Sequence, residues 1–357
     1  MGVGSRLLGA AAAGAGAVTT AALAGGVVER RVVKARRNAA PLVAELGRLR
    51  GTPTEVVTED GVRLHVEVDE EAPYAGTGAA AVGPTLVFVH GYALNLDCWH
   101  FQREHFRGRH RMVFYDHRSH GRSGRSPRDN ATIDQLGRDL RTVLDAVVPT
   151  GPVVLVGHSM GGMAVLALAD QHPELLGDRV VGAALLSTLA GGMRSHRIFG
   201  RLLPDRLMSA ITPRVVAGLA RAPELVESVR RAGSNVGFLV TDRWAFGDDV
   251  PAGYVEFVDE MLAGTPMDVL AEFFPGFDTL DKFHALPPFE RVPTLVLCGT
   301  EDRLTGIAHS RKLADLIAGS TLVEARGAGH MVILERHEQV NDALGRLVAR
   351  ATERTVA

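Results

Sequence analysis

The chain has few cysteines and almost no excess charge, and both deficits narrow the classes of protein to which it can belong. Its 357 residues include two cysteines, Cys98 and Cys298, which are far apart and lack the spacing of metal ligands. A disulfide framework is therefore not expected, and a reducing compartment is the simpler interpretation. The formal net charge is only -2, so the composition gives no indication of a nucleic-acid partner.

The first fifty residues differ in composition from the rest. Residues 7–28 carry no charge and are mostly Ala and Gly, and a basic cluster follows at once: Arg30, Arg31, Lys34, Arg36 and Arg37. Three interpretations stay open, namely a membrane anchor with the protein on the cytoplasmic side, a signal peptide cleaved near residues 22–24, and a flexible or peripheral amphipathic leader. The anchor would bring the protein to a membrane surface; a cytoplasmic location is otherwise expected, and export is less favoured. We therefore separate a leader, 1–50, from a globular domain, 51–357.

Short apolar runs alternate with helix-like segments beyond the leader. Residues 54–70, TEVVTEDGVRLHVEVDE, contain two alternating runs around Asp60-Gly61, which predicts a β-hairpin. Six later runs are apolar at nearly every position, as in strands buried on both faces of a parallel sheet: TLVFVH, RMVFYD, VVLVGH, VVGAALLS, TLVLCG and STLVEA. Strands separated by helices predict an α/β fold with a mostly parallel sheet flanked by helices.

About a hundred residues between Thr188 and Pro293 interrupt this rhythm. They have helical periodicity without a clear strand, and Pro213 and Pro223 are expected to separate two short helices. The block also carries eleven of the Phe, Trp and Tyr residues of the chain. These features predict an inserted helical cap at about 189–290 whose aromatic side chains help to line an apolar pocket.

One serine lies between two glycines where an apolar strand meets a helix-like segment. In Gly157-His158-Ser159-Met160-Gly161, a tight strand-to-helix turn would strain the serine, and its neighbours must lack bulk. Such a turn exposes the serine Oγ at the carboxyl end of the sheet, beside a helix N-terminus that favours negative charge. We therefore interpret Ser159 as a nucleophile rather than as a helix cap.

A serine hydroxyl needs a base to accept its proton. The segment GTEDRLTG directly follows the predicted strand TLVLC and offers Asp302, with Glu301 as the alternative. The segment RGAGHMV follows the last predicted strand and offers His330 on a glycine-rich loop. The order Ser159, Asp302, His330 predicts a catalytic triad in which the aspartate orients the histidine.

A developing oxyanion also needs hydrogen-bond donors. In FVHGYALN, His90-Gly91 lies just past a predicted strand, where the backbone N–H of Tyr92 is expected to point into the site. The N–H of Met160, next to the nucleophile, is the expected second donor. We expect His90 itself to be a structural hydrogen-bonding residue.

Taken together, five segments resemble the α/β-hydrolase superfamily over roughly residues 54–350: HGYALN, DHRSHGRSGRS, GHSMGG, GTEDRLT and GAGHMV. The resemblance implies an eight-stranded sheet, a cap after the sixth strand and ester-type hydrolysis. Ser119 departs from the pattern, because relatives often have glycine there; this changes a supporting loop and leaves the triad intact. Asp116 and Arg118 are expected to be structural.

We expect a serine hydrolase that cleaves a carboxylic ester, with an apolar or lipid-like small-molecule substrate favoured by the aromatic cap. The resemblance also implies that epoxide hydrolase or haloalkane dehalogenase chemistry would place an aspartate at position 159. Acyl transfer and the cleavage of a thioester, a lactone or a C–C bond remain alternatives on the same triad, and a non-catalytic ligand-binding member is a further one. No metal or cofactor is expected, because no further ligands assemble around Asp116, His117 and His120.

Overall fold

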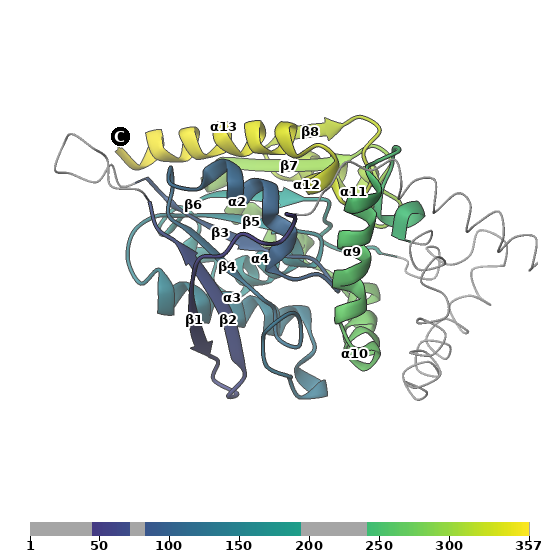
Figure 1. Cartoon of the computed structure of the whole chain (residues 1–357). Coiled ribbons are helices and arrows are strands. Elements are labelled where there is room, and N and C mark those ends of the chain that lie inside the picture. The colour runs from purple at the N-terminus through teal and green to yellow at the C-terminus, as the bar shows by residue number, and fades with distance from the viewer. Residues whose placement is uncertain (1–44, 72–82, 194–240, 357) are drawn as a thin grey trace, which may run out of the picture.

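The computed structural model of the chain describes residues 45–71, 83–193 and 241–356. Within these ranges eight strands form one sheet in the order β1-β2-β4-β3-β5-β6-β7-β8 (Figure 1). The strands are β1 (Thr52–Val57), β2 (Arg63–Asp69), β3 (Thr85–Val89), β4 (Met112–Tyr115), β5 (Val153–His158), β6 (Val180–Leu186), β7 (Thr294–Gly299) and β8 (Thr321–Ala325). The β1–β2 and β2–β4 pairs are antiparallel and all others are parallel. The predicted α/β class and mostly parallel sheet are therefore confirmed.

Both faces of the central part of the sheet are buried, which explains why its central strands are apolar at nearly every position. In β3, Val87 and Val89 pack into the hydrophobic core on one face, whereas Leu86 and Phe88 pack into the core on the other. Successive strand residues point to opposite faces, so a sheet covered by helices on both sides needs this continuous apolar pattern.

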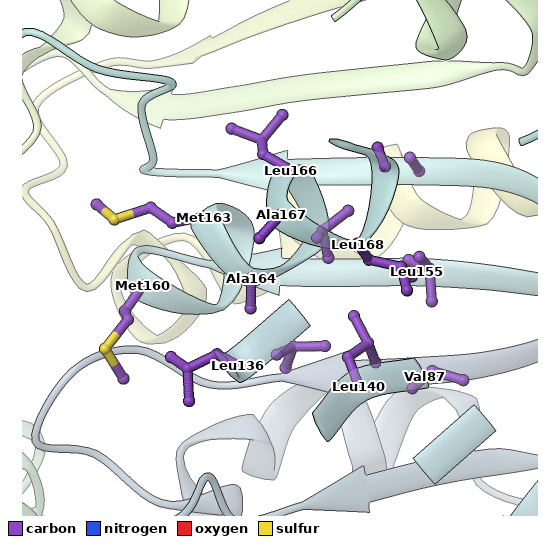
Figure 2. Packing of buried hydrophobic residues seen from close by; sticks show 14 of the residues in the cluster. Val87, Leu136, Leu140, Leu155, Met160, Met163, Ala164, Leu166, Ala167 and Leu168 are labelled. Atoms are coloured by element: carbon purple, nitrogen blue, oxygen red, sulfur yellow. The ribbon is translucent and has the colours of Figure 1, made fainter. Parts of the chain in front are cut away.

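Helices cover both faces. They are α2 (His100–Phe106), α3 (Ile133–Val147), α4 (Met160–Gln171), α9 (Ala252–Gly264), α10 (Met267–Asp278), α11 (Gly306–Leu316), α12 (Val332–Glu335) and α13 (His337–Val356). Helix α4 is buried along almost its whole length because it lies between the sheet and α3. Figure 2 shows side chains of α4 gathered in one cluster with Val87 and Leu155 of the strands and with Leu136 and Leu140 of α3. This packing fixes the N-terminus of α4 at the end of β5.

The described part of the segment between β6 and β7 includes α9 and α10. Figure 1 shows these two helices (green) at one end of the sheet. The short helices expected around Pro213 and Pro223 lie outside the described residues, as does most of the predicted leader, 1–50. The division of the chain into leader, globular domain and cap at about 189–290 therefore stays a prediction.

The described residues include both cysteines and several helices whose length and polarity can be assessed. Cys98 and Cys298 are both buried free thiols. Every helix in the described ranges is too short or too polar to cross a bilayer.

Candidate active site

The residue that links β5 to α4 has an unusual backbone conformation. Ser159 has φ 53° and ψ −120°, in a region that side chains other than glycine rarely adopt. Its amide donates to Leu186 O at 2.9 Å. Its carbonyl oxygen accepts a 2.7 Å hydrogen bond from the hydroxyl of Thr188, which follows β6. The turn is thus held by the neighbouring strand, which over-determines the strained conformation.

The flanking glycines are required by close backbone contacts. A Cβ atom at Gly161 would overlap the carbonyl oxygen of Val89, and one at Gly157 would lie 2.7 Å from Gly161 O. Both contacts would be shorter than normal van der Waals contacts, so a side chain at either position would displace the backbone of the turn. The serine motif predicts small residues at these positions for the same steric reason.

Three residues from distant parts of the chain meet at this turn. His330 Nε2 lies 2.9 Å from Ser159 Oγ, and His330 Nδ1 lies 2.9 Å from Asp302 Oδ2. A carboxylate can only accept, so the proton is on Nδ1 and Nε2 is left to accept the serine hydroxyl. The alternative acid, Glu301, is exposed to solvent. The structure therefore brings Ser159, Asp302 and His330 together and leaves Glu301 outside the cluster.

The carboxylate of Asp302 is fully hydrogen-bonded. Thr305 Oγ1 donates to Oδ2 at 2.7 Å, while the amides of Leu304 and Thr305 donate to Oδ1 at 2.9 and 2.8 Å. Burial alone would raise the pKa of Asp302, but the interactions with His330 and Thr305 outweigh it and hold the pKa below its ordinary value. Asp302 is therefore ionised throughout the neutral range. Thr305 was not predicted as a partner of Asp302. Its position three residues after the aspartate could have indicated this local hydrogen bond.

The loop after β3 lies against the serine. A Cβ atom at Gly91 would be 3.1 Å from Ser159 Cβ. Within the described residues, no hydrogen-bond acceptor pairs with the backbone N–H of Tyr92 or Met160. Met160 is the first residue of α4, where amides have no partner inside the helix. In the part of the chain that the structure describes, both N–H groups are therefore unpaired, one in the loop beside Ser159 and one in the residue that follows it.

His90 holds this loop in place. Its Nδ1–H donates to Gly91 O at 2.8 Å, and its Nε2 accepts from the amide of His117 at 2.9 Å. Burial, together with His117, lowers the pKa of His90 well below its ordinary value. The imidazole is therefore neutral, and its two hydrogen bonds connect the loop after β3 to the segment after β4.

A second neutral histidine connects the loop of His330 to the end of β5. His158 Nε2–H donates to the backbone oxygen of His330 at 2.9 Å. Burial, assisted by His330, lowers the pKa of His158 to about 3. From the sequence His158 was recognisable only as part of the serine motif, because its contact with His330 spans 172 residues.

A cavity of about 240 Å³ opens onto Ser159 and His330. Asp, Glu, Lys and Arg are absent from its described wall. Apart from Gly91 and Thr305, the other lining residues are Tyr92, Leu94, Met163, Met193, Thr241, Trp244, Ala245, Val258, Leu262, Phe274, Phe277, Leu304 and Met331. The helices α9 and α10 thus supply part of an almost entirely apolar wall.

The acidic and basic residues after β4 hold loops together. Asp116 accepts from the amides of Leu96 and Arg122, each at 2.7 Å. Arg118 is buried and pairs with Asp139 at 2.6 Å and with Asp60 at 2.8 Å. In the described ranges, no group of three or more His, Cys, Asp and Glu side chains is arranged to hold a metal ion.

The departure at Ser119 has a conformational consequence. Ser119 has φ 64°, in the left-handed region that glycine adopts without steric cost. Its hydroxyl accepts from the amide of Ser126 at 2.9 Å and from Arg125 at 3.2 Å. These hydrogen bonds help to hold Ser119 in this left-handed conformation.

The chain matches the family model described as alpha/beta hydrolase fold over residues 84–337. It is 26% identical to 3-oxoadipate enol-lactonase 2 of Acinetobacter baylyi over 75% of this chain and 89% of the relative. It is 27% identical to a monoacylglycerol lipase of Mycolicibacterium smegmatis over 65% of this chain and 75% of the relative. An esterase of Thermogutta terrifontis has a similar fold, with a TM-score of 0.65 and 24% identity over 84% of this chain and 99% of the esterase.

The family match covers the strands β3 to β8 and every residue of the cluster around Ser159. The eight-stranded order and the helices on both faces agree with it. The protein therefore belongs to the alpha/beta hydrolase fold family and is a hydrolase.

Proposed function

We propose that the protein hydrolyses a neutral, apolar carboxylic ester through a Ser159–His330–Asp302 triad. The observation that carries this proposal is the continuous hydrogen-bonded chain from Ser159 Oγ through both nitrogens of His330 to Asp302 Oδ2, with both distances 2.9 Å. It is the arrangement in which a serine can lose its proton as it attacks.

The first half of the reaction forms an acyl-enzyme. Ser159 Oγ attacks the ester carbon, and its proton passes to His330 Nε2. The negative charge on the carbonyl oxygen is stabilised by the backbone N–H groups of Tyr92 and Met160. His330 then gives the proton to the departing alkoxide, which leaves as the alcohol.

The second half returns the enzyme to its starting state. A water molecule gives a proton to His330 Nε2 and attacks the acyl carbon. When the tetrahedral intermediate collapses, Ser159 Oγ leaves and takes the proton back, and the carboxylic acid is released. Asp302 stays ionised in both halves and stabilises the positive charge of the imidazolium. No step needs a metal ion or an organic cofactor.

The cavity supports a neutral substrate. A buried charge without a partner is strongly unfavourable, and the described wall offers no Lys or Arg to a substrate carboxylate. Apolar groups gain about 25 cal/mol for each Å² removed from water, which favours acyl chains that fill the space between α9 and α10. The similarity to a protein named as a monoacylglycerol lipase agrees with this substrate class.

Lactone hydrolysis is the second candidate. A relative is named as an enol-lactonase, and a lactone carbonyl would meet the same serine and donors. A lactone differs from an open ester because the leaving alcohol stays attached to the acyl group. Comparing a neutral medium-chain lactone with an ester of the same carbon number separates the two candidates.

The test uses the full chain with p-nitrophenyl esters from acetyl to palmitoyl. Wild type is compared with Ser159→Ala and with Ser320→Ala, a serine in the turn before β8. We expect turnover that Ser159→Ala abolishes and Ser320→Ala preserves, with a medium-chain optimum. No turnover at any chain length would overturn ester hydrolysis, and activity that survives in Ser159→Ala would show that the nucleophile is a different residue.

A further inference from the structure

The loop that carries one candidate oxyanion donor is tied to the two helices that line the cavity. The hydroxyl of Tyr92 donates to the backbone oxygen of Leu270 in α10 at 2.5 Å. The hydroxyl of Thr265, the residue that follows α9, donates to the backbone oxygen of Ala93 at 3.3 Å. Two side-chain hydrogen bonds thus join residues 92–93 to a part of the chain more than 170 positions away.

The loop needs such support because its backbone is strained. Ala93 has φ 60°, a left-handed conformation that is unfavourable for a residue with a Cβ atom. Strained residues persist only where their surroundings over-determine the conformation. His90 holds the start of the loop through Gly91 O and His117 N. Its far side is held by Tyr92 and Thr265.

The side chain of Tyr92 is shaped for this contact. Its ring packs edge-on against Phe277 of α10, with ring centroids 5.0 Å apart, and both residues line the cavity. Burial raises the pKa of the Tyr92 hydroxyl well above its ordinary value, so the group stays protonated and donates. The hydroxyl donates its hydrogen bond to the backbone oxygen of Leu270. The ring of Tyr92 therefore contributes an apolar surface to the cavity wall.

We propose that α9 and α10 hold the oxyanion donor in position, and that Tyr92, through its hydroxyl, and Thr265 are the positioning residues of this coupling. This inference rests on the proposed ester hydrolysis and names which contacts set its geometry. The backbone N–H of Tyr92 belongs to the same residue as the anchored hydroxyl, so a shift of α10 moves the donor relative to Ser159. The helices that bind the substrate therefore also align the group that stabilises its transition state.

The coupling predicts an effect on kcat rather than on KM. The negative charge on the oxygen is absent from the bound ester and develops only as the tetrahedral intermediate forms, so a displaced donor weakens transition-state binding and leaves ground-state binding unchanged. Removing one donor completely costs on the order of 10²–10³ in kcat. Misplacing it by the loss of one supporting hydrogen bond is expected to cost about five- to tenfold.

The test compares four single variants of the full chain. Tyr92→Phe keeps the ring on Phe277 and removes the hydroxyl. Thr265→Val removes the second hydrogen bond at nearly constant shape, and Thr265→Ser restores a hydroxyl. Tyr254→Phe is the matched control, because Tyr254 of α9 packs against Phe101 and does not line the cavity. The readouts are kcat, KM, the melting temperature and the affinity of an alkyl boronic acid, which forms a tetrahedral adduct with a serine.

For Tyr92→Phe we expect kcat to fall about five- to tenfold, KM to stay within about twofold, and boronate affinity to fall with kcat. Thr265→Val should behave in the same way, and Thr265→Ser and Tyr254→Phe should match wild type. Wild-type kcat in both Tyr92→Phe and Thr265→Val, or a loss confined to KM, would overturn the coupling. If Tyr92→Phe fails to fold, the Val and Ser variants at position 265 decide. A wild-type protein without Ser159-dependent turnover would instead overturn the proposed function.

Discussion

The hydroxyl of Thr188 lies 2.7 Å from the backbone oxygen of Ser159 and donates a hydrogen bond to it. Thr188 is fully buried and follows β6, the neighbour of β5 in the sheet. The serine turn is therefore supported from the adjacent strand as well as by its own helix. The same oxygen also accepts from the amides of Gly162 and Met163 at 2.9 and 3.2 Å.

Thr188→Val should lower both stability and activity by modest amounts. The oxygen of Ser159 keeps its two amide donors, so the loss is that of one hydrogen bond, about 1 kcal/mol in the free energy of unfolding. A slightly looser turn is expected to reduce kcat a few-fold. Urea unfolding and steady-state kinetics on one ester measure both. Thr188→Ser should behave like wild type, and a Ser variant as impaired as the Val variant would contradict a role for the hydroxyl.

Asp302→Asn should reduce kcat by about 10³–10⁴ without unfolding the protein. The amide oxygen can still accept from Thr305, but its NH₂ group cannot accept the Nδ1 proton of His330. The imidazole then loses the tautomer that leaves Nε2 free to accept from Ser159. Steady-state kinetics measures the loss. Glu301→Gln, at the exposed neighbouring carboxylate, should retain full activity; equal losses in the two variants would show that the acid is misassigned.

Two Gly→Ala substitutions should change stability in opposite directions. At Gly161 the new Cβ would overlap Val89 O, so Gly161→Ala is expected to lose about 3 kcal/mol or more of unfolding free energy. At Gly345, inside α13, no atom lies within 4 Å of an added Cβ. Gly345→Ala should therefore stabilise the helix by about 1 kcal/mol. Thermal and urea unfolding compare the pair, and a tolerated Gly161→Ala would contradict the steric argument.

The protein should lose stability as the pH falls below neutral. Burial lowers the pKa of His117 and of His158 to about 3 and that of His120 to about 4. An unfolded histidine has a pKa of about 6.5, so between these values the unfolded chain binds more protons than the folded one. The free energy of unfolding therefore increases as the pH rises through this window and decreases as the pH falls through it. Each of these histidines lowers the free energy of unfolding by about 2 kcal/mol at pH 5 relative to pH 8.

One buried carboxyl acts in the opposite direction. Burial raises the pKa of Asp116 to about 6, so its contribution favours folding at acidic pH and is lost as the pH rises through about 4 to 6. The contribution of Asp116 offsets that of about one histidine to the free energy of unfolding. Urea unfolding from pH 5 to 8 measures how the free energy of unfolding depends on pH. His117→Gln keeps a donor for His90 O and should reduce the number of protons taken up on unfolding by about one. Stability that is constant from pH 5 to 7 would be incompatible with neutral buried histidines.

The strands and the serine motif could be predicted from the sequence because both depend on local patterns. A strand buried on both faces is apolar at nearly every position, and the two strands of a hairpin alternate; all eight predicted strands are present. The serine was recognisable because its glycines are adjacent in the chain, and His330 because it follows the last strand.

Which carboxylate faces His330 depended on the turn after β7. Glu301 and Asp302 are adjacent, and the sequence favours Asp302 by its spacing from Gly299 but leaves Glu301 as an alternative. The turn directs Asp302 into the protein, where Thr305 binds its carboxylate, and leaves Glu301 in solvent.

The sequence by itself determined the fold class, the positions of the strands and the identity of the serine and histidine, because each follows from burial or from neighbours along the chain. Only the tertiary structure decided how the site is supported. Thr188 on Ser159, His158 on His330 and Tyr92 on Leu270 join segments that are 29, 172 and 178 residues apart. Such contacts form only when the sheet brings the ends of its strands together, and no local pattern encodes which side chains then meet.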